Sequence, residues 1–326
     1  MPRARTAAPR RRRIGVIDVG TNSTKLLVGE VHDGDIRTVA FDRRASRIGE
    51  KLSGSKRIST IAAARTGRDV ASLAKIAREY GSGTIVAVGT YAFRAAKNGD
   101  AVAKRIARDS GVPVRVLTGE EEASLTYLSA LLHLRQPKPH TFVLDLGGGS
   151  VEFIAARRGH VVEAKSLPLG ALRLTERHLH SDPPTTTERR ALEREVDAAV
   201  ARLTTRFRRV PSARADFVAC GGTATTAVTM LGGRAYGTQA TVRVSELRAL
   251  AERCFELTIA QRKRLPGLPA DRADIIPAGL LVVLSFARAV RKRSIVVSDG
   301  GVREGVLLAI DAELDELDHE RVAHSH

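Results

Sequence analysis

The chain has 326 residues, of which 43% are hydrophobic and 27% are charged, and its formal net charge is +17. This composition is typical of a soluble globular protein long enough for two domains of ordinary size. No apolar run approaches the ~20 residues that a membrane-spanning helix needs, and the two cysteines, Cys220 and Cys254, do not make a disulfide framework or a metal site. We therefore expect a cytoplasmic protein.

The amino terminus is rich in arginine, but no apolar stretch follows it that would make a secretory signal. We expect residues 1–13 to form a disordered basic leader, whose six arginines leave a charge of +11 for the rest of the chain. A body this basic should attract polyanions such as polyphosphate or nucleotides. Specific binding of nucleic acid is not expected, because only 4% of residues are aromatic, Trp is absent, and no DNA-binding motif is present.

The first half of the chain alternates the patterns of strands and helices. A hairpin is expected over residues 15–41, with a turn at residues 33–34. Apolar residues at helical spacing then predict a helix from Ile58 to about Tyr80. The remaining elements expected in this half are a strand over 84–88, a helix over 100–109, a strand over 112–117 and a helix over 120–134.

The second half repeats this plan after a proline-containing break at residues 136–139. Strands that alternate with helices predict an α/β protein with mixed sheets, and we expect residues 318–326 to be a disordered tail. The elements expected in this half are a hairpin over 141–167, a helix over 187–208, a strand over 216–220 followed by a helix, a helix starting at about 245, a helix over 274–290, a strand over 295–297 and a final helix.

One glycine-containing motif occurs twice, at corresponding places in the two halves. Residues 17–23 read IDVGTNS and residues 144–150 read LDLGGGS, so Asp, Gly and Ser keep the same offsets in both copies. Each copy lies between two short apolar runs, which predicts a hairpin whose tight turn exposes backbone N–H groups. Such amides form a concave site for phosphate, and glycine lets the backbone approach closely. The repeat predicts two related half-domains that face each other across a phosphate site.

Eight sequence blocks, in order along the chain, resemble the exopolyphosphatase/guanosine pentaphosphate phosphohydrolase (Ppx/GppA) family in its short two-domain form. The resemblance implies two actin-like (ribonuclease H-like) α/β domains with mixed sheets flanked by helices, and an active site in the cleft between them. Domain I would comprise residues 14–117 plus about 302–317, and domain II residues 118–301. The blocks are IDVGTNSTKLLV (17–28), SRIGEKL (46–52), GTYAFRAAKN (89–98), TGEEEA (118–123), DLGGGSVE (145–152), CGGTATT (220–226), IIPAGLLV (275–282) and SDGGVREG (298–305).

The expected phosphate-binding groups are glycine turns, their polar neighbours and arginines from these blocks. Amides of three turns would surround the phosphates, and arginines would bind phosphate oxygens bidentately. A purely conformational role remains the alternative for any single glycine, and a surface position for any single arginine. The residues are Gly20, Thr21, Asn22, Ser23, Arg47, Arg94, Gly147, Gly148, Gly149, Ser150, Gly221, Gly222, Thr223 and Arg303.

Two carboxylates, Asp145 and Glu152, flank the second turn, seven residues apart across the hairpin. A turn of this kind can bring both carboxylates to the same end of the hairpin, where their hard oxygen atoms suit Mg²⁺. In the family resemblance this pair is the metal site, and other divalent cations could replace magnesium. The alternatives are turn initiation for Asp145 and a solvated strand face for Glu152.

Three acidic residues, Glu120, Glu121 and Glu122, open the helix that follows the strand at 112–117. Acidic residues at a helix N-terminus are also expected from the helix dipole alone. The family resemblance singles out the residue before Ala123, so Glu122 would be the general base that takes a proton from water. Glu121 is the second candidate, because spacing in the sequence does not decide which side chain faces the cleft.

These features together predict a Mg²⁺-dependent phosphoanhydride hydrolase that releases terminal phosphate from inorganic polyphosphate or from guanosine pentaphosphate (pppGpp). One alternative is an ATP-dependent small-molecule kinase of the same superfamily, which would usually carry an aspartate base. Another is a non-catalytic sensor of polyanions or nucleotides, against which the joint presence of Glu122, Asp145 and Glu152 argues. A homodimer is compatible with the sequence.

Overall fold

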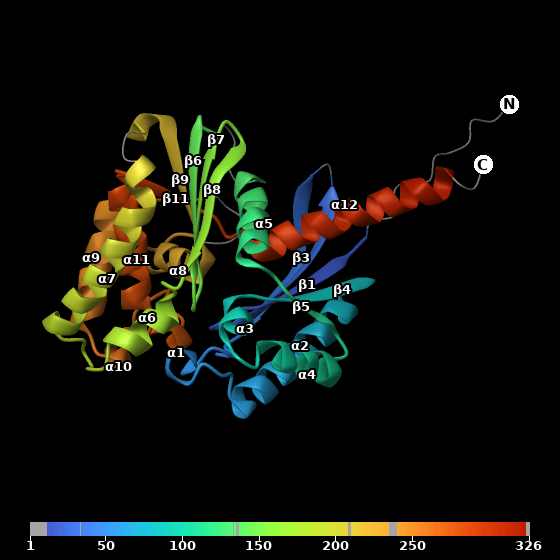
Figure 1. The fold of residues 1–326 in the computed structure, drawn as a ribbon, viewed down its shortest axis with the longest axis horizontal. Coiled ribbons are helices and arrows are strands. Elements are labelled where there is room, and N and C mark those ends of the chain that lie inside the picture. The colour runs from blue at the N-terminus through green and yellow to red at the C-terminus, as the bar shows by residue number, and fades with distance from the viewer. Residues whose placement is uncertain are drawn as a thin grey trace.

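The computed structural model describes residues 12–32, 34–132, 134, 137–207, 210–234 and 240–323. Figure 1 shows two lobes side by side, each built around one β-sheet, with α5 (Gly119–Leu132) and the start of α12 (Val302–Ala323) where the lobes meet. Within the described residues, no helix combines the length and the apolar character that a membrane span requires.

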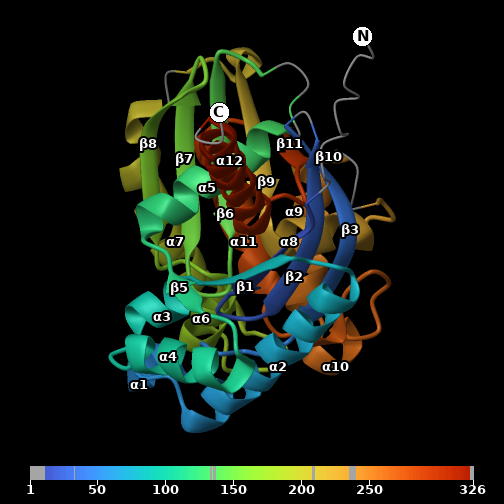
Figure 2. The same cartoon turned by 90° about the vertical axis from the view of Figure 1, so that its right-hand side faces the viewer.

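The first lobe consists of β1 (Ile14–Val19), β2 (Thr24–His32), β3 (Asp35–Arg44), α1 (Leu52–Ser55), α2 (Thr60–Glu79), β4 (Thr84–Gly89), α3 (Tyr91–Ala95), α4 (Gly99–Ser110) and β5 (Val114–Val116). Its sheet has the order β3-β2-β1-β4-β5 and is mixed, because β1 pairs antiparallel with β2 and parallel with β4. α2 packs on one face of this sheet beside α4, and α12 packs against β1 and β2 on the other face (Figure 2).

The second lobe contains β6 (His140–Leu146), β7 (Val151–Arg157), β8 (His160–Leu167), α6 (Ala171–His178), α7 (Thr186–Thr204), β9 (Ala215–Cys220), α8 (Gly221–Met230), β10 (Ala240–Arg243), α9 (Val244–Glu256), α10 (Ile259–Arg262), α11 (Ile276–Ala289) and β11 (Ser294–Val297). Its sheet has the order β10-β11-β9-β6-β7-β8. α7, α9 and α11 cover one face of the sheet, and α5 packs on the other.

The two sheets have the same arrangement around a central hairpin. In the β1–β2 hairpin Asp18 lies opposite Lys25, and in the β6–β7 hairpin Asp145 lies opposite Glu152. Each hairpin continues antiparallel into a third strand, and its first strand pairs parallel with a strand that follows later in the chain. The duplicated α/β architecture with mixed sheets, predicted from the repeated motif, is therefore confirmed.

α2 illustrates why the sequence forms a helix at its position. Its N-cap is Ser59, whose hydroxyl accepts a hydrogen bond from the Ala62 N–H and satisfies one of the unpaired amides of the first turn. Val70, Leu73 and Ala77 recur at helical spacing, and all three are buried against the sheet. Each fully buried Val or Leu side chain contributes about 1.5–3 kcal/mol to folding, so this stripe holds α2 on the first lobe.

The amino-terminal boundary differs from the expectation. Residues 1–11 lie outside the described residues, but Arg12 pairs with Asp315 at 2.6 Å and Arg13 pairs with Glu30 at 2.8 Å. The disordered leader that we expected over residues 1–13 is therefore wrong for its last two residues. Both arginines are held because acidic partners on α12 and β2 lie beside the start of β1.

The carboxyl terminus also differs. α12 continues to Ala323, so residues 318–323 are helical where we expected a disordered tail, and residues 324–326 lie outside the described residues. The physical reason is cooperative helix growth. The start of α12 is nucleated by packing against β1 and β2, and the residues that follow include the strong helix formers Leu, Glu and Ala, which extend a helix at little cost.

Candidate active site

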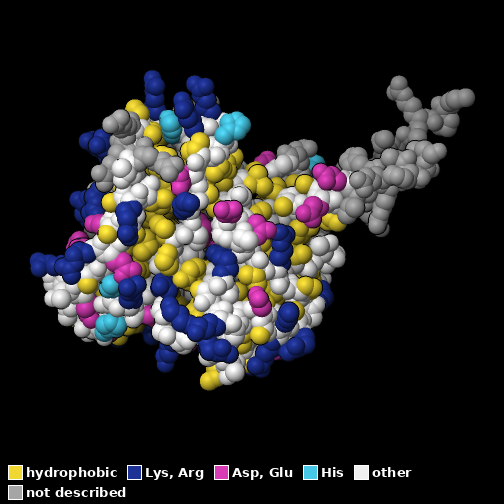
Figure 3. Space-filling model, viewed as in Figure 1, with side chains coloured by type: hydrophobic (Ala, Val, Ile, Leu, Met, Phe, Trp, Pro, Cys, Tyr) yellow, Lys and Arg dark blue, Asp and Glu magenta, His cyan; other side chains and the backbone are white. Residues whose placement is uncertain are grey.

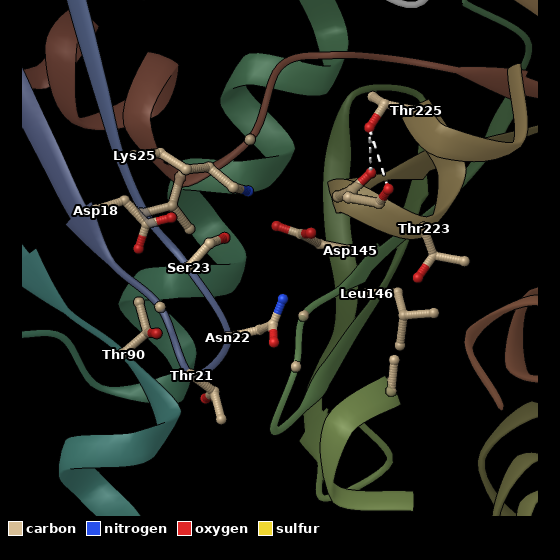
Figure 4. Close-up of a pocket in the computed structure, with 18 of the residues that line it drawn as sticks. Asp18, Thr21, Asn22, Ser23, Lys25, Thr90, Asp145, Leu146, Thr223 and Thr225 are labelled. Carbon is tan, nitrogen blue, oxygen red and sulfur yellow. Dashed lines mark hydrogen bonds between the residues drawn. The ribbon is translucent and has the colours of Figure 1, made fainter. Parts of the chain in front are cut away.

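Three glycine turns meet in the cleft between the lobes. The turn at residues 20–23 joins β1 to β2, the turn at 147–150 joins β6 to β7, and residues 221–222 open α8. In both hairpin turns the first glycine amide donates a hydrogen bond to the serine carbonyl, at 3.1 Å and 3.0 Å respectively. Figure 4 shows the two hairpins facing each other across the cleft. This arrangement brings backbone amides from both lobes to one place.

The two hairpin turns approach so closely that only glycine fits between them. A Cβ atom on Gly148 would lie 2.8 Å from the Cβ of Asn22 in the opposite lobe. A Cβ on Gly149 would lie 2.6 Å from the Thr21 hydroxyl and 2.3 Å from the Tyr91 ring. Because real Cβ atoms do not come this close to other atoms, Gly148 and Gly149 of the second motif are required for contact between the lobes.

The third turn places a helix N-terminus and a guanidinium group beside the other two. Gly221 has a φ of +88°, a conformation that favours glycine. A Cβ on Gly222 would lie 1.8 Å from Nη1 of Arg272, so the guanidinium of Arg272 rests directly on this turn. The N-terminus of α8 carries a partial positive charge, which suits an anion.

Most of the predicted site residues come together here. Glu122, Asp145 and Glu152 line the cleft, and so does every predicted phosphate-binding residue except Arg47 and Arg94. The phosphate-binding residues that line the cleft are Gly20, Thr21, Asn22, Ser23, Gly147, Gly148, Gly149, Ser150, Gly221, Gly222, Thr223 and Arg303.

Three carboxylates lie together on the second-lobe side of the cleft. Asp145 is at the end of β6 and accepts a hydrogen bond from the Thr126 hydroxyl at 3.2 Å. Glu152 is fully buried on β7, and its Oε1 accepts hydrogen bonds from the hydroxyls of Ser150 at 2.8 Å and Ser166 at 2.7 Å. Glu122, in the first turn of α5, is also buried.

The crowding of these carboxylates makes their charged forms costly. Burial, reinforced by the charge of Glu152, raises the pKa of Glu122 well above its ordinary value. Burial together with the neighbouring charge of Asp145 raises the pKa of Glu152 to about 7. Burial also raises the pKa of Asp145. A cation bound among these carboxylates would stabilise their charged forms and lower their pKa values.

The donor set fits a hard divalent cation bound mainly through water and substrate. Within the described residues, no group of three or more His, Cys, Asp or Glu side chains is arranged to enclose a metal ion. Asp145 and Glu152 nevertheless offer carboxylate oxygens beside the glycine turns, and Mg²⁺ typically takes one or two carboxylates and completes its shell with water and phosphate oxygens. These two residues could therefore hold Mg²⁺ against a bound phosphate.

Several charged residues of the cleft were missed by the sequence analysis. Asp18 and Lys25 on the first hairpin and Arg43 and Arg272 also line the cleft. Figure 4 shows Asp18, Lys25 and Asp145 pointing into the space between the hairpins. Burial, with a smaller effect of Arg303, lowers the pKa of Lys25 to about 8. The repeated motif could have identified Asp18 and Lys25, because they occupy the positions that Asp145 and Glu152 have in the second copy.

Glu121 lies outside the cleft, so the structure disfavours the second candidate for the base. Its carboxylate accepts a hydrogen bond from the Thr118 N–H at 2.7 Å, which caps α5, and it pairs with Arg115. Its side chain is 37% exposed, whereas that of Glu122 is 8% exposed. The direction of the side chains around α5 explains the difference, because neighbours in sequence point to different faces of a helix.

Arg94 and Arg47 do not line the cleft either, and each has a protein partner instead. Arg94 pairs with Glu122 at 2.7 Å and donates a hydrogen bond to the Leu117 carbonyl at 2.7 Å. Arg47 donates two hydrogen bonds, each 2.8 Å long, to the carboxylate of Asp274 in the other lobe. In this structure both guanidinium groups pair with carboxylates, so the direct contact of Arg47 and Arg94 with phosphate stays a prediction.

Comparison with known proteins gives matches over most of the chain. The model of the Ppx/GppA phosphatase family matches residues 27–313. Exopolyphosphatase 1 of Mycobacterium tuberculosis is 32% identical over 311 residues, covering 93% of this chain and 90% of that protein. The crystal structure of the Aquifex aeolicus Ppx/GppA family member is 27% identical, with a TM-score of 0.75, and covers 93% of this chain and 98% of that one. An exopolyphosphatase structure from Cytophaga hutchinsonii has the same fold, with a TM-score of 0.83 at 24% identity and coverage of 92% and 97%.

Proposed function

The chain belongs to the Ppx/GppA phosphatase family, and we propose that it releases terminal phosphate from inorganic polyphosphate in a Mg²⁺-dependent reaction. Family membership makes it a hydrolase of phosphoanhydride bonds and confirms the actin-like fold predicted from the sequence. The observation that carries the finer proposal is the position of Glu122, Asp145 and Glu152 beside three glycine turns in one cleft.

The hydrolysis requires a proton acceptor next to water. Glu122 would take a proton from a water molecule whose oxygen attacks the terminal phosphorus. The bond between that phosphorus and the bridging oxygen breaks, so that orthophosphate and a polyphosphate shorter by one unit leave. The ion pair with Arg94 would hold the Glu122 carboxylate in a fixed direction during this step.

Binding of the phosphates requires positive charge that is already in place. The amides of the three turns, with Lys25, Arg272 and Arg303, supply donors and cations from both lobes. Mg²⁺ held by Asp145 and Glu152 would add positive charge against the phosphate oxygens, as metal ions do in phosphoryl transfer. Groups fixed before the reaction stabilise developing charge without reorganisation, which is the largest contribution in many enzymes.

The proposal is tested by measuring phosphate release from polyphosphates of defined length, guanosine pentaphosphate and ATP, each with and without Mg²⁺. We expect release from polyphosphate that requires the metal. If phosphate is released from guanosine pentaphosphate but not from polyphosphate, guanosine pentaphosphate is the substrate. Phosphate transfer from ATP to an added alcohol, with no hydrolysis of polyphosphate, would favour the kinase alternative, and binding without turnover would favour the sensor.

Loss of Arg94 should change the pH dependence of the reaction. Glu122 acts as a base only when deprotonated, so kcat/KM falls as the pH drops through its pKa. Burial and then Glu152 raise that pKa, and Arg94 opposes them. Arg94→Gln is therefore expected to move the acid limb of the kcat/KM profile to higher pH, and Arg94→Lys, which keeps a positive charge, to move it less. A limb that stays in place or moves to lower pH in Arg94→Gln would contradict the assignment of Glu122.

Long and short substrates should respond differently to salt. The chain carries +11 outside residues 1–13, and Figure 3 shows Lys and Arg side chains over much of one face, with a group where the lobes meet. A long polymer contacts more of these charges than the cleft alone can offer. Each phosphate contact contributes ~0.7–0.9 to the slope of log affinity against log salt for nucleic acids, and the slope for long polyphosphate should be steep in the same sense.

The control for this prediction is deletion of residues 2–11, which removes four arginines but keeps Arg12 and Arg13 with their partners. We expect a shallower salt slope for binding of long polyphosphate and unchanged turnover of a short substrate. Equal slopes for long and short substrates in the full chain would show that the basic surface does not bind the polymer.

A further inference from the structure

Two arginines of the first lobe bind two aspartates of the second, and we call these four residues, Arg43, Arg47, Asp271 and Asp274, the interlobe clamp. Both Nη atoms of Arg47 donate to the Asp274 carboxylate at 2.8 Å, and one also donates to the Asp271 carbonyl at 2.7 Å. Arg43, at the end of β3, pairs with the Asp271 carboxylate. The side chains of Arg47 and Asp274 are each only 25% exposed, so water competes weakly for the pair.

On the first-lobe side, the clamp is attached directly to the first glycine turn. The Arg47 N–H donates to the Asn22 carbonyl at 3.0 Å, and the Gly49 N–H donates to the Thr21 carbonyl at 3.0 Å. Arg47 has a φ of +44°, which is uncommon outside glycine. Its backbone is held there because Arg65 donates to the Arg47 carbonyl at 3.3 Å. Movement of the first turn therefore moves Arg47.

On the second-lobe side, the two aspartates of the clamp flank Arg272, the cation beside the third turn. Arg272 lies between the two aspartates in sequence, and its guanidinium rests on Gly222. The side chain is 8% exposed and lines the cleft. Backbone hydrogen bonds from Arg272 to the Pro269 carbonyl at 2.9 Å and from Ile275 to the Arg272 carbonyl at 3.1 Å keep the segment compact. The orientation of the Arg272 side chain therefore depends on where Asp271 and Asp274 are held.

We propose that Arg47 and Asp274 are positioning residues, which couple docking of the lobes to the placement of Arg272 against the substrate phosphates. The continuous path runs from Asn22 through Arg47 to Asp274, and from there to Arg272 on the third turn. When the lobes are docked, the guanidinium of Arg272 and the amides of the first glycine turn reach the same phosphate. The inference rests on the proposed function only for the identity of that substrate.

The kinetic test uses Arg47→Ala, Asp274→Asn and the double variant, with the substrate that wild type hydrolyses fastest. Misplacement of a binding group by about 1 Å can cost ~10²-fold in rate, so we expect each single variant to lose kcat/KM on that order. The double variant should be no worse than either single one, because both changes break the same contact. Unchanged kcat/KM in Asp274→Asn, or losses that multiply in the double variant, would overturn the proposal.

Four further variants separate positioning from other roles. Arg272→Ala and Arg272→Ala with Arg47→Ala should be equally impaired, because Arg47 acts through Arg272. Arg47→Lys keeps the charge without the bidentate geometry and should fall between wild type and Arg47→Ala. Arg189→Ala is the matched control, since Arg189 binds Glu252 through both Nη atoms inside the second lobe. Arg189→Ala should retain wild-type kcat/KM, and a loss equal to that of Arg47→Ala would overturn the proposal.

A measurement without turnover keeps this inference distinct from the proposed function. Small-angle X-ray scattering should give a larger radius of gyration for Arg47→Ala than for wild type, and no change for Arg189→Ala. Thermal unfolding confirms that each variant is folded at the temperature used. If wild type hydrolyses no polyphosphate, the proposed function fails, yet scattering still decides the clamp. An unchanged radius of gyration in folded Arg47→Ala would overturn the clamp itself.

Discussion

Replacement of Glu122 by Gln is expected to lower kcat by ~10²–10⁴-fold, the contribution that a general base typically makes, while substrate binding stays largely intact. The amide keeps the size of the side chain and can still accept a hydrogen bond from Arg94, but it does not take a proton from water. The measurement is initial-rate kinetics with polyphosphate, combined with calorimetric binding of the same substrate to the variant.

The matched control is Glu121→Gln, which changes the neighbouring residue of the same helix. Glu121 caps α5 and pairs with Arg115 outside the cleft, so its loss should leave kcat close to that of wild type. A fully active Glu122→Gln would refute the base assignment. A slow Glu121→Gln with the same stability as wild type would transfer the assignment to Glu121.

Replacement of Asp145 by Asn is expected to raise sharply the Mg²⁺ concentration needed for half-maximal activity. Loss of a residue that only supports a metal ligand typically costs ~10–100-fold in metal affinity, and loss of a ligand should cost at least as much. Glu152→Gln should show a smaller effect, because Oε1 of Glu152 already accepts hydrogen bonds from Ser150 and Ser166, which leaves this carboxylate fewer free lone pairs for a metal than Asp145. Metal titrations of activity at saturating substrate give these values.

The control for the metal prediction is Asp216→Asn, which removes a carboxylate from a neighbouring strand of the same sheet. Asp216 accepts a hydrogen bond from the Lys138 N–H at 2.8 Å and does not line the cleft. Its metal titration should match that of wild type. Titrations of Asp145→Asn and Glu152→Gln that overlay the wild-type curve would exclude this metal site.

Short elements were the part of the fold that the sequence patterns did not reveal. The long α2 and α11 were predicted close to their bounds, because each repeats the helical period several times. α1, α3, α6, α10 and β10 were missed, since four to eight residues are too few to show a period. Of these, α6 matters most for the site, because its first amide donates to the Gly147 carbonyl at 3.0 Å and supports the second turn.

Local sequence patterns were enough to predict the two hairpins, their glycine turns and the two carboxylates that flank the second turn. These features are local: an Asp–Gly–Ser spacing between apolar runs specifies strand, turn and strand without any distant partner. The same spacing places Asp145 and Glu152 on the two strands of one hairpin, and in the structure they lie directly opposite each other. The repeat also determined that two such units exist, from which the two-lobed fold follows.

Contacts between segments far apart in the sequence determine which side chains face the cleft and which arginines bind carboxylates of the protein. Glu121 and Glu122 are adjacent residues of the same type, so the sequence does not distinguish them. The packing of α5 buries the side chain of Glu122 and leaves that of Glu121 partly exposed. Arg47 and Asp274 are 227 residues apart, so their hydrogen bonds depend on how the lobes dock. A guanidinium binds carboxylates and phosphates with the same geometry, so its sequence environment does not reveal which partner the folded chain will bring to it.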